Sequence, residues 1–250
     1  MQMFAIYKKE LRSYFTNPHG YVFAGIFLVL SSLIFCYTTL LSQSYDTSTY
    51  YLVMVFAFVV LVPLLTMRLF TEEKKLRTEQ LLLTAPVTIT GMVLGKFFAA
   101  FTLFFSCTAI SCINLIPLYL IAAGERGNLS YDTTHIGPVT PEIIGCLIGI
   151  IFIGAAFIAI GTYISSLTEN QLASAIITIA VLVVLVGVGL FANVVDVYAV
   201  RAVINWISVL GRFSGLSAGV FDIASIIYFV SLAFVFIFLT VRVYEKRRWN

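Results

Sequence analysis

Charge is scarce in this sequence. Aspartate, glutamate, lysine and arginine together make up 11% of the 250 residues, whereas 60% are hydrophobic and the mean hydropathy is +1.02. This composition excludes the water-soluble classes, because a soluble domain carries about 25% charged residues. Long uncharged runs are instead typical of a polytopic membrane protein.

Residues that usually carry catalysis or bind metals are also few. The two histidines are His19 and His135, and no aspartate lies in an expected span, which argues against a histidine metal site, an aspartyl protease and carboxylate-driven transport. The four cysteines lie in apolar runs without metal-binding spacing. The nearest approach to a phosphate loop, 91–97, lacks the serine or threonine that would bind Mg²⁺. We therefore expect no catalytic residue, metal or cofactor in this chain.

Six apolar runs are long enough to cross the hydrocarbon core of a membrane, about 30 Å, as helices. Lys96, near the start of the third run, is expected to snorkel to the interface. Gly145 and Gly149 in the fourth run have a spacing that permits close helix contact. We predict spans of one transmembrane domain, residues 1–250, at about 21–41, 50–69, 89–121, 143–164, 171–193 and 223–241.

Two segments outside the spans have amphipathic patterns. In 1–16, an apolar stripe of Phe4, Tyr7, Leu11 and Tyr14 lies between basic residues, which predicts an interfacial amphipathic helix. The segment 194–221 is too polar for a span, and we expect short extracytoplasmic helices or a re-entrant pair before the last span. The predicted fold class is all-α.

Charge is concentrated in one internal stretch between the second and third spans. Six of the eight residues at 72–79 are ionisable, so this stretch must lie outside the bilayer. We predict a short helix over 71–86, capped by Thr71 and supported by an ion pair between Glu73 and Arg77. Such a helix could transmit a movement of a water-soluble partner to the membrane-spanning helices. The alternative is a solvated loop that only fixes the topology.

Basic residues are divided unevenly between the two sides of this topology. By the positive-inside rule, the richer side is cytoplasmic and holds both termini and the charged stretch. Of 15 lysines and arginines, 12 share that side (Lys8, Lys9, Arg12, Arg68, Lys74, Lys75, Arg77, Lys96, Arg242, Lys246, Arg247 and Arg248) and 3 do not (Arg126, Arg201 and Arg212).

Four segments resemble the permease subunits of ABC-2 type transporters, most closely the branch of gliding-motility and nitrous-oxide-reductase-maturation permeases. The family's cytoplasmic coupling segment is similar to FTEEKKLRTEQLLLTAPVTITGMVLGK at 70–96. Its second cytoplasmic turn is similar to IGTYISSLTENQLASAI at 160–176. The amphipathic entry helix and the entry to the last span resemble KKELRSYFTNPHGYV at 8–22 and LSAGVFDIASIIYF at 216–229. Arg77 departs from the pattern, because many members have glycine there.

The resemblance implies a six-span permease that pairs with a second permease copy and docks on a cytoplasmic ATPase dimer. ATP and Mg would bind to that ATPase, and an extracytoplasmic accessory protein is a further implied partner. The implied location is the cell membrane of a prokaryote. The chain is therefore expected to contact the lipid bilayer and to bind no nucleic acid. The residues implied to couple to the ATPase are Glu72, Glu73, Lys74, Lys75, Arg77, Thr78, Glu79, Gln80, Leu81, Leu82, Leu83 and Pro86 of the coupling helix. The second cytoplasmic turn consists of Ser165, Ser166, Thr168, Glu169, Asn170 and Gln171. The positive-inside count puts this turn on the same face, so a soluble partner could reach it as well.

Three functions remain open from the sequence. The leading one is the non-catalytic permease subunit of an ATP-binding cassette transporter, with an unidentified substrate and export as the expected direction. The alternative is a membrane anchor or scaffold that recruits a cytoplasmic protein through the charged helix, without transport. An intramembrane enzyme is disfavoured because no catalytic constellation is found.

Overall fold

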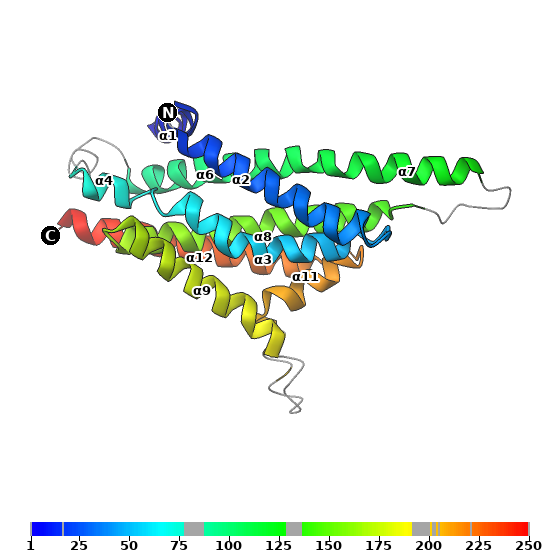
Figure 1. Cartoon of the computed structure of the whole chain (residues 1–250). Coiled ribbons are helices and arrows are strands. Elements are labelled where there is room, and N and C mark those ends of the chain that lie inside the picture. The colour runs from blue at the N-terminus through cyan, green and yellow to red at the C-terminus, as the bar shows by residue number, and fades with distance from the viewer. Residues whose placement is uncertain are drawn as a thin grey trace.

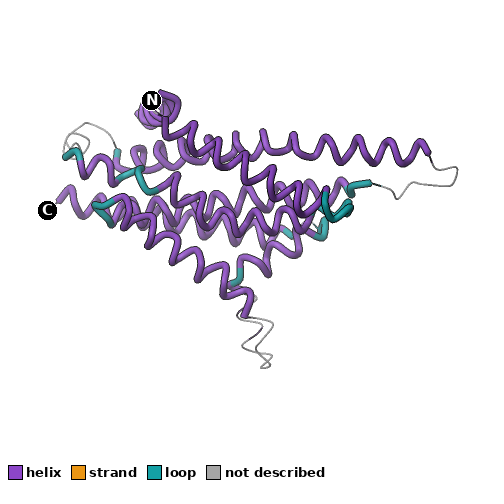
Figure 2. The backbone as a smooth tube through the Cα atoms, viewed as in Figure 1, coloured by secondary structure: helices purple, strands orange, loops and turns teal. Residues whose placement is uncertain are grey.

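The computed structural model of the chain is a bundle of helices (Figures 1 and 2). It describes residues 2–16, 18–77, 88–128, 137–191, 201, 204, 206–220 and 222–249. Within these ranges every regular element is helical, as predicted. The main helices are α1 (Gln2–Thr16), α2 (Pro18–Phe35), α3 (Ser48–Thr66), α4 (Thr71–Lys75), α6 (Ile89–Ser111), α7 (Leu115–Asn128), α8 (Thr140–Leu167), α9 (Gln171–Phe191), α11 (Val209–Ser217) and α12 (Ile223–Trp249).

Six helical segments in the described ranges are long and apolar enough to cross a membrane, so the chain is a multi-pass membrane protein. Each overlaps one predicted span. Several run further than predicted, because polar residues that lower the hydropathy still continue the helix. The six are Pro18–Leu40, Ser48–Lys75, Ile89–Gly124, Thr140–Leu167, Gln171–Leu190 and Ile223–Arg248.

Both chain ends lie at the same end of the bundle, together with α4 (Figure 1). We call this the terminal end. The opposite end, where α7 ends and α8 begins, is the distal end (Figure 1).

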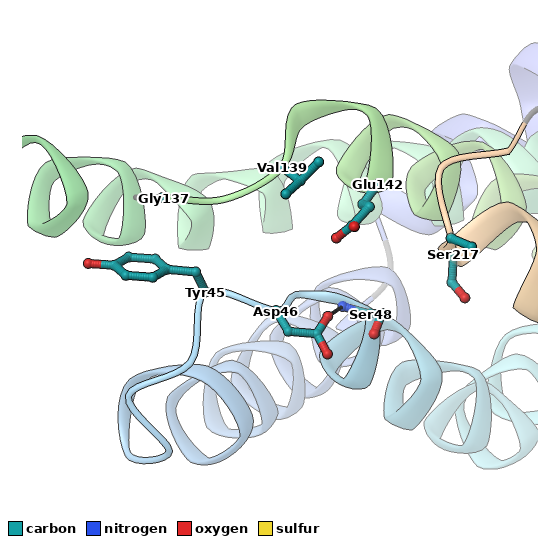
Figure 3. Close-up of a pocket in the computed structure, with 8 residues that line it drawn as sticks. Tyr45, Asp46, Ser48, Gly137, Val139, Glu142 and Ser217 are labelled. Atoms are coloured by element: carbon teal, nitrogen blue, oxygen red, sulfur yellow. Dashed lines mark hydrogen bonds between the residues drawn. The ribbon is translucent and has the colours of Figure 1, made fainter. Parts of the chain in front are cut away.

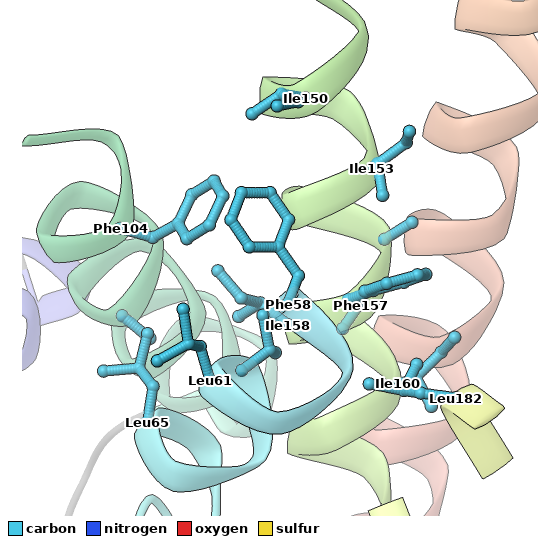
Figure 4. Close-up of a cluster of buried hydrophobic side chains, with 14 of the residues drawn as sticks. Phe58, Leu61, Leu65, Phe104, Ile150, Ile153, Phe157, Ile158, Ile160 and Leu182 are labelled. Atoms are coloured by element: carbon cyan, nitrogen blue, oxygen red, sulfur yellow. The ribbon is translucent and has the colours of Figure 1, made fainter. Parts of the chain in front are cut away.

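The centre of the bundle is α8, which packs against α3, α6, α9, α11 and α12. Its sequence is apolar on all sides, as expected for a helix surrounded by others. Phe157 of α8 belongs to the same buried cluster as Phe58 of α3 and Phe104 of α6 (Figure 4). The rings of Phe58 and Phe104 meet edge to face with centroids 5.0 Å apart.

The third span contains an irregular turn, a 3₁₀ segment at Cys112–Asn114 between α6 and α7. Pro117 explains its position, because proline has no amide hydrogen and clashes with the carbonyl four residues earlier. There Asn114 donates to the hydroxyl of Ser31 at 3.1 Å and accepts from Ser32 at 3.2 Å, which ties this turn to α2.

The described part of the segment before the last span folds back on the bundle. Phe213 and Leu216 of α11 are buried against α8 and α9. A methyl group on Gly145 of α8 would lie 2.2 Å from the Leu216 carbonyl oxygen, and one on Gly149 would lie 2.9 Å from the Phe213 ring. The predicted close contact at this glycine pair is confirmed, and α11 is the neighbour. Most of the earlier part of this segment lies outside the described residues.

The N-terminal helix α1 forms as predicted, but with a different buried face. Ile6 is buried, whereas Phe4 is 67% exposed. The helix packs on α6 and α2, and the Tyr7 hydroxyl makes a hydrogen bond with that of Thr102 at 3.1 Å. The predicted stripe is therefore divided: Tyr7 and Tyr14 face the bundle, whereas Phe4 faces outward. The prediction left out Ile6 and Glu10, which complete the inward face.

Candidate partner-docking site

Of the predicted coupling helix over 71–86, residues 71–77 are described, and α4 occupies only Thr71–Lys75 of them, because the chain turns at 76–77. It has acidic residues in its first turn and lysines in its last. This order is favourable for the helix dipole. The predicted cap is wrong, because Phe70 holds the capping position and the Thr71 hydroxyl donates to the carbonyl of Met67. Outside the described residues lie Thr78, Glu79, Gln80, Leu81, Leu82, Leu83 and Pro86.

The predicted ion pair between Glu73 and Arg77 is also wrong. Glu73 points to Lys96, while Arg77 lies beyond the end of α4 with φ of 55°. That φ is in the left-handed region, which glycine adopts more readily than arginine. The pair that forms with the predicted four-residue spacing is Arg68–Glu72, at 3.0 Å.

A buried ammonium group joins three segments at the terminal end. Lys96 of α6 is 1% exposed, and its Nζ donates to Glu73 Oε1 at 2.8 Å and to the Leu69 carbonyl at 2.7 Å. It also contacts Glu10 Oε1 of α1 at 3.3 Å and lies 5.1 Å from the centre of the Phe70 ring. The predicted snorkelling of Lys96 is therefore wrong, since the carboxylates of α1 and α4 meet its charge inside the protein. We call these five residues the Lys96 centre.

Beside the Lys96 centre lies a polar cavity of about 40 Å³. Burial raises the pKa of the Tyr14 phenol, and the nearby Glu10 carboxylate raises it further, so Tyr14 remains neutral. The cavity is lined by Glu10, Ser13, Tyr14, His19, Arg68, Leu69 and Glu72.

The two segments predicted to meet a partner lie side by side, although about ninety residues separate them. The Lys74 ammonium group donates to the carbonyls of Ser166 and Thr168, the second at 2.9 Å. The backbone N–H of Phe70 donates to Ser165 Oγ at 3.2 Å. These bonds fasten α4 to the end of α8, so the two segments form one surface.

The second turn is shorter than predicted. Because α8 continues to Leu167, Ser165 and Ser166 belong to its last helical turn. Asn170 precedes α9, and its side-chain oxygen accepts from the backbone N–H of Leu172 at 3.0 Å, as an N-terminal cap does. Gln171 is the first residue of α9.

A groove of about 500 Å³ opens between the two segments. One side carries the exposed Lys75, and the other carries Glu169. Charges of both signs at an exposed groove suit a polar protein partner better than a lipid chain. The groove is lined by Lys75, Glu169, Asn170, Gln171 and Leu172.

A second recess, of about 480 Å³, lies at the distal end (Figure 3). Asp46 and Glu142 both line it, and Asp46 Oδ1 accepts from the backbone N–H of Ser48 at 2.8 Å. Asp46 thus helps to start α3. Within the described ranges, no three or more histidine, cysteine, aspartate or glutamate residues are grouped so that they could hold a metal ion.

Sequence reasoning missed the Lys96 centre because its members come from distant segments. Glu10 and Lys96 are 86 residues apart, and Glu73 and Lys96 are 23 apart. One signal was present: Glu10 lies one turn after Ile6 and one before Tyr14, so it shares their face of α1. An acidic residue on the inward face of a helix requires a partner.

No protein-family model matches this sequence, and no curated protein matches it. The function must therefore be inferred from the chain's own contacts. These contacts build one polar surface from α4 and the end of α8, backed by a buried ionic centre, on a six-span membrane bundle.

Proposed function

We propose that the chain is the membrane-spanning permease subunit of an ATP-binding cassette transporter, driven by ATP that a separate subunit hydrolyses. The observation that carries this proposal is the union of α4 with the α8–α9 turn through Lys74. The family resemblance implies that the first of these segments docks on the ATPase, and the predicted topology puts the second on the same face. Although about ninety residues separate them, the bonds of Lys74 join them into one surface.

The contacts behind this surface suit a coupling role. A displacement of α4 would act on α8 through Lys74, and on α6 and α1 through the Lys96 centre. Phe70 extends the path to α12, because its ring lies 4.9 Å from that of Tyr244. A displacement of α4 would therefore be transmitted to α8, α6, α1 and α12 through direct side-chain contacts, without a flexible linker.

Orientation and location belong to the same proposal. The terminal end carries Lys8, Lys9 and Arg12 of α1 and the basic last turn of α12, which favours a cytoplasmic position under the positive-inside rule. Both termini and the groove would then face the cytoplasm of a prokaryotic cell. The implied assembly contains two permease copies and two ATPase subunits that hold ATP and Mg, with an extracytoplasmic accessory protein as a further partner and an unidentified substrate for export.

Co-purification tests the proposal. The tagged chain is extracted from its native membrane, and the recovered complex is examined for an ATP-hydrolysing subunit in a two-to-two ratio. We expect Lys75→Glu and Glu169→Lys each to weaken the complex about tenfold or more, because each places a like charge in the groove. The matched control Arg248→Glu, an exposed charge reversal on α12, should leave recovery unchanged.

The proposal fails if no ATP-hydrolysing subunit accompanies the chain. It also fails if the groove variants retain that subunit as firmly as the control does. Recovery of a cytoplasmic partner that hydrolyses no ATP would instead support the anchor or scaffold function.

A further inference from the structure

The helix α1 has an inner and an outer face. Its inner face holds Ile6, Glu10 and Tyr14 against the bundle, where Glu10 contacts Lys96. The outer face points away from the protein, and the proposed function uses its basic residues only to orient the chain.

The outer face is aromatic. Phe4 is 67% exposed and Phe15 is 50% exposed. They are eleven residues apart, close to three helical turns, and so lie on the same side of α1. The ring of Phe15 meets that of Tyr21, at the start of α2, with centroids 6.1 Å apart.

This aromatic face continues into the membrane-spanning surface. After Tyr21, the exposed side of α2 carries Val22, Ile26, Val29 and Leu33, an apolar row along the first span. In the single chain this apolar row has no protein neighbour, and its side chains suit the hydrocarbon. Because the ring of Phe15 meets that of Tyr21, the residue just before this row, the aromatic face of α1 lies at the boundary between hydrocarbon and headgroups.

Basic residues lie along the edge of this aromatic face. Lys8 is one turn after Phe4 and Arg12 is one turn after Lys8, and both are exposed. Lys9 is exposed as well, 3.9 Å from the carboxylate of Glu10. With the aromatic face at the hydrocarbon boundary, the long side chains of Lys8 and Arg12 reach the level of the headgroups.

We propose that α1 is a binding site for anionic phospholipid, with Lys8 and Arg12 holding the headgroup phosphate and Phe4 and Phe15 inserted beside its acyl chains. Charge complementarity and the unbroken connection to the α2 surface favour a lipid over a soluble acidic protein. The inference depends only on the membrane-spanning character of the chain and goes beyond the proposed transport function.

Lipid titration tests this site. The purified full chain is titrated in detergent with phosphatidylglycerol or phosphatidylcholine, and retained lipids are counted by native mass spectrometry. We expect phosphatidylglycerol to bind more tightly than phosphatidylcholine. One basic residue near an anionic headgroup contributes about fivefold in affinity, so Lys8→Gln with Arg12→Gln should weaken phosphatidylglycerol binding about 30-fold and leave phosphatidylcholine unaffected.

The matched control is Lys246→Gln with Arg248→Gln, which removes the same charge at the same end of the bundle (Figure 1). It should change phosphatidylglycerol binding less than threefold. Equal affinity for the two lipids, or an equal loss in the control, overturns the proposal. If the double variant fails to fold, Lys8→Gln and Arg12→Gln alone should each cost about fivefold, and no loss in either overturns it.

Discussion

Removal of the buried ammonium group of Lys96 should destabilise the protein, because the carboxylates of Glu10 and Glu73 would lose their cation. In Lys96→Met the side chain keeps nearly its length and loses its charge. Glu10 and Glu73 are 16% and 14% exposed, so neither can turn freely into water. They would remain close together without a cation.

The geometry gives the scale of this effect. At an effective dielectric constant of about 20, Coulomb attractions at 2.8 and 3.3 Å amount to about 6 and 5 kcal/mol. Desolvation of each ion opposes them by several kcal/mol. Removing one partner of a buried ionic group typically costs about 3–5 kcal/mol, and we expect Lys96→Met to lose that much free energy of unfolding.

A triple variant separates charge from packing. Lys96→Met with Glu10→Gln and Glu73→Gln removes all three charges, and replacement of a whole buried ionic group is often close to neutral. We expect it to regain most of the loss.

The assay is reversible unfolding in mixed micelles, followed by the helical circular dichroism signal. The exposed control Lys75→Met should lie within about 0.5 kcal/mol of the unmodified chain. The reasoning is refuted if Lys96→Met is as stable as that control, or if the triple variant is as unstable as Lys96→Met.

Three further predictions concern single positions. Arg77→Gly should raise the free energy of unfolding by about 0.5–1 kcal/mol in the same assay, because the φ of 55° strains a residue with a Cβ. Gly154→Ala should lower it by about 1–3 kcal/mol, since its methyl group would lie 2.2 Å from the Phe104 ring, whereas Gly25→Ala, with nothing within 4 Å, should not. The hydrogen bond from Ser225 lowers the pKa of Asp222, so its contribution to stability is present above pH 3.8, the unfolded value, and is lost as the pH falls through the lower folded pKa. Unfolding followed from pH 6 to pH 2.5 should show this loss, and Asp222→Asn should remove that part of the pH dependence.

The six spans could be predicted because membrane crossing depends on the length and hydropathy of a local segment. The observed segments differ from the predictions mainly at their ends. There, residues such as Ser165 and Ser166 continue α8 although they lower its hydropathy. A helix ends where its hydrogen bonding ends, and composition does not determine that point.

The ionic contacts could not be predicted, because they depend on tertiary structure. From the sequence alone, a lysine near the start of an apolar run, such as Lys96, is expected to extend its side chain to the interface. Only the fold shows that Glu10 and Glu73 face this lysine inside the protein. Local spacing likewise predicted that Glu73 would pair with Arg77, but a buried ammonium group is a stronger partner than an exposed guanidinium. The sequence thus identified the charged segment, and only the fold showed which charges point inward.

The joint between α4 and the end of α8 has unequal partners. Lys74 donates to the main-chain oxygens of Ser166 and Thr168, which every amino acid supplies. Ser166 is itself buried, so larger side chains there would disturb the packing, but substitutions at Thr168 can alter the outer shape of the turn without breaking the joint. Loss of the lysine breaks the joint. A saturation scan should find position 74 intolerant and position 168 permissive, so the turn can adapt to a new binding partner while its attachment to α4 persists.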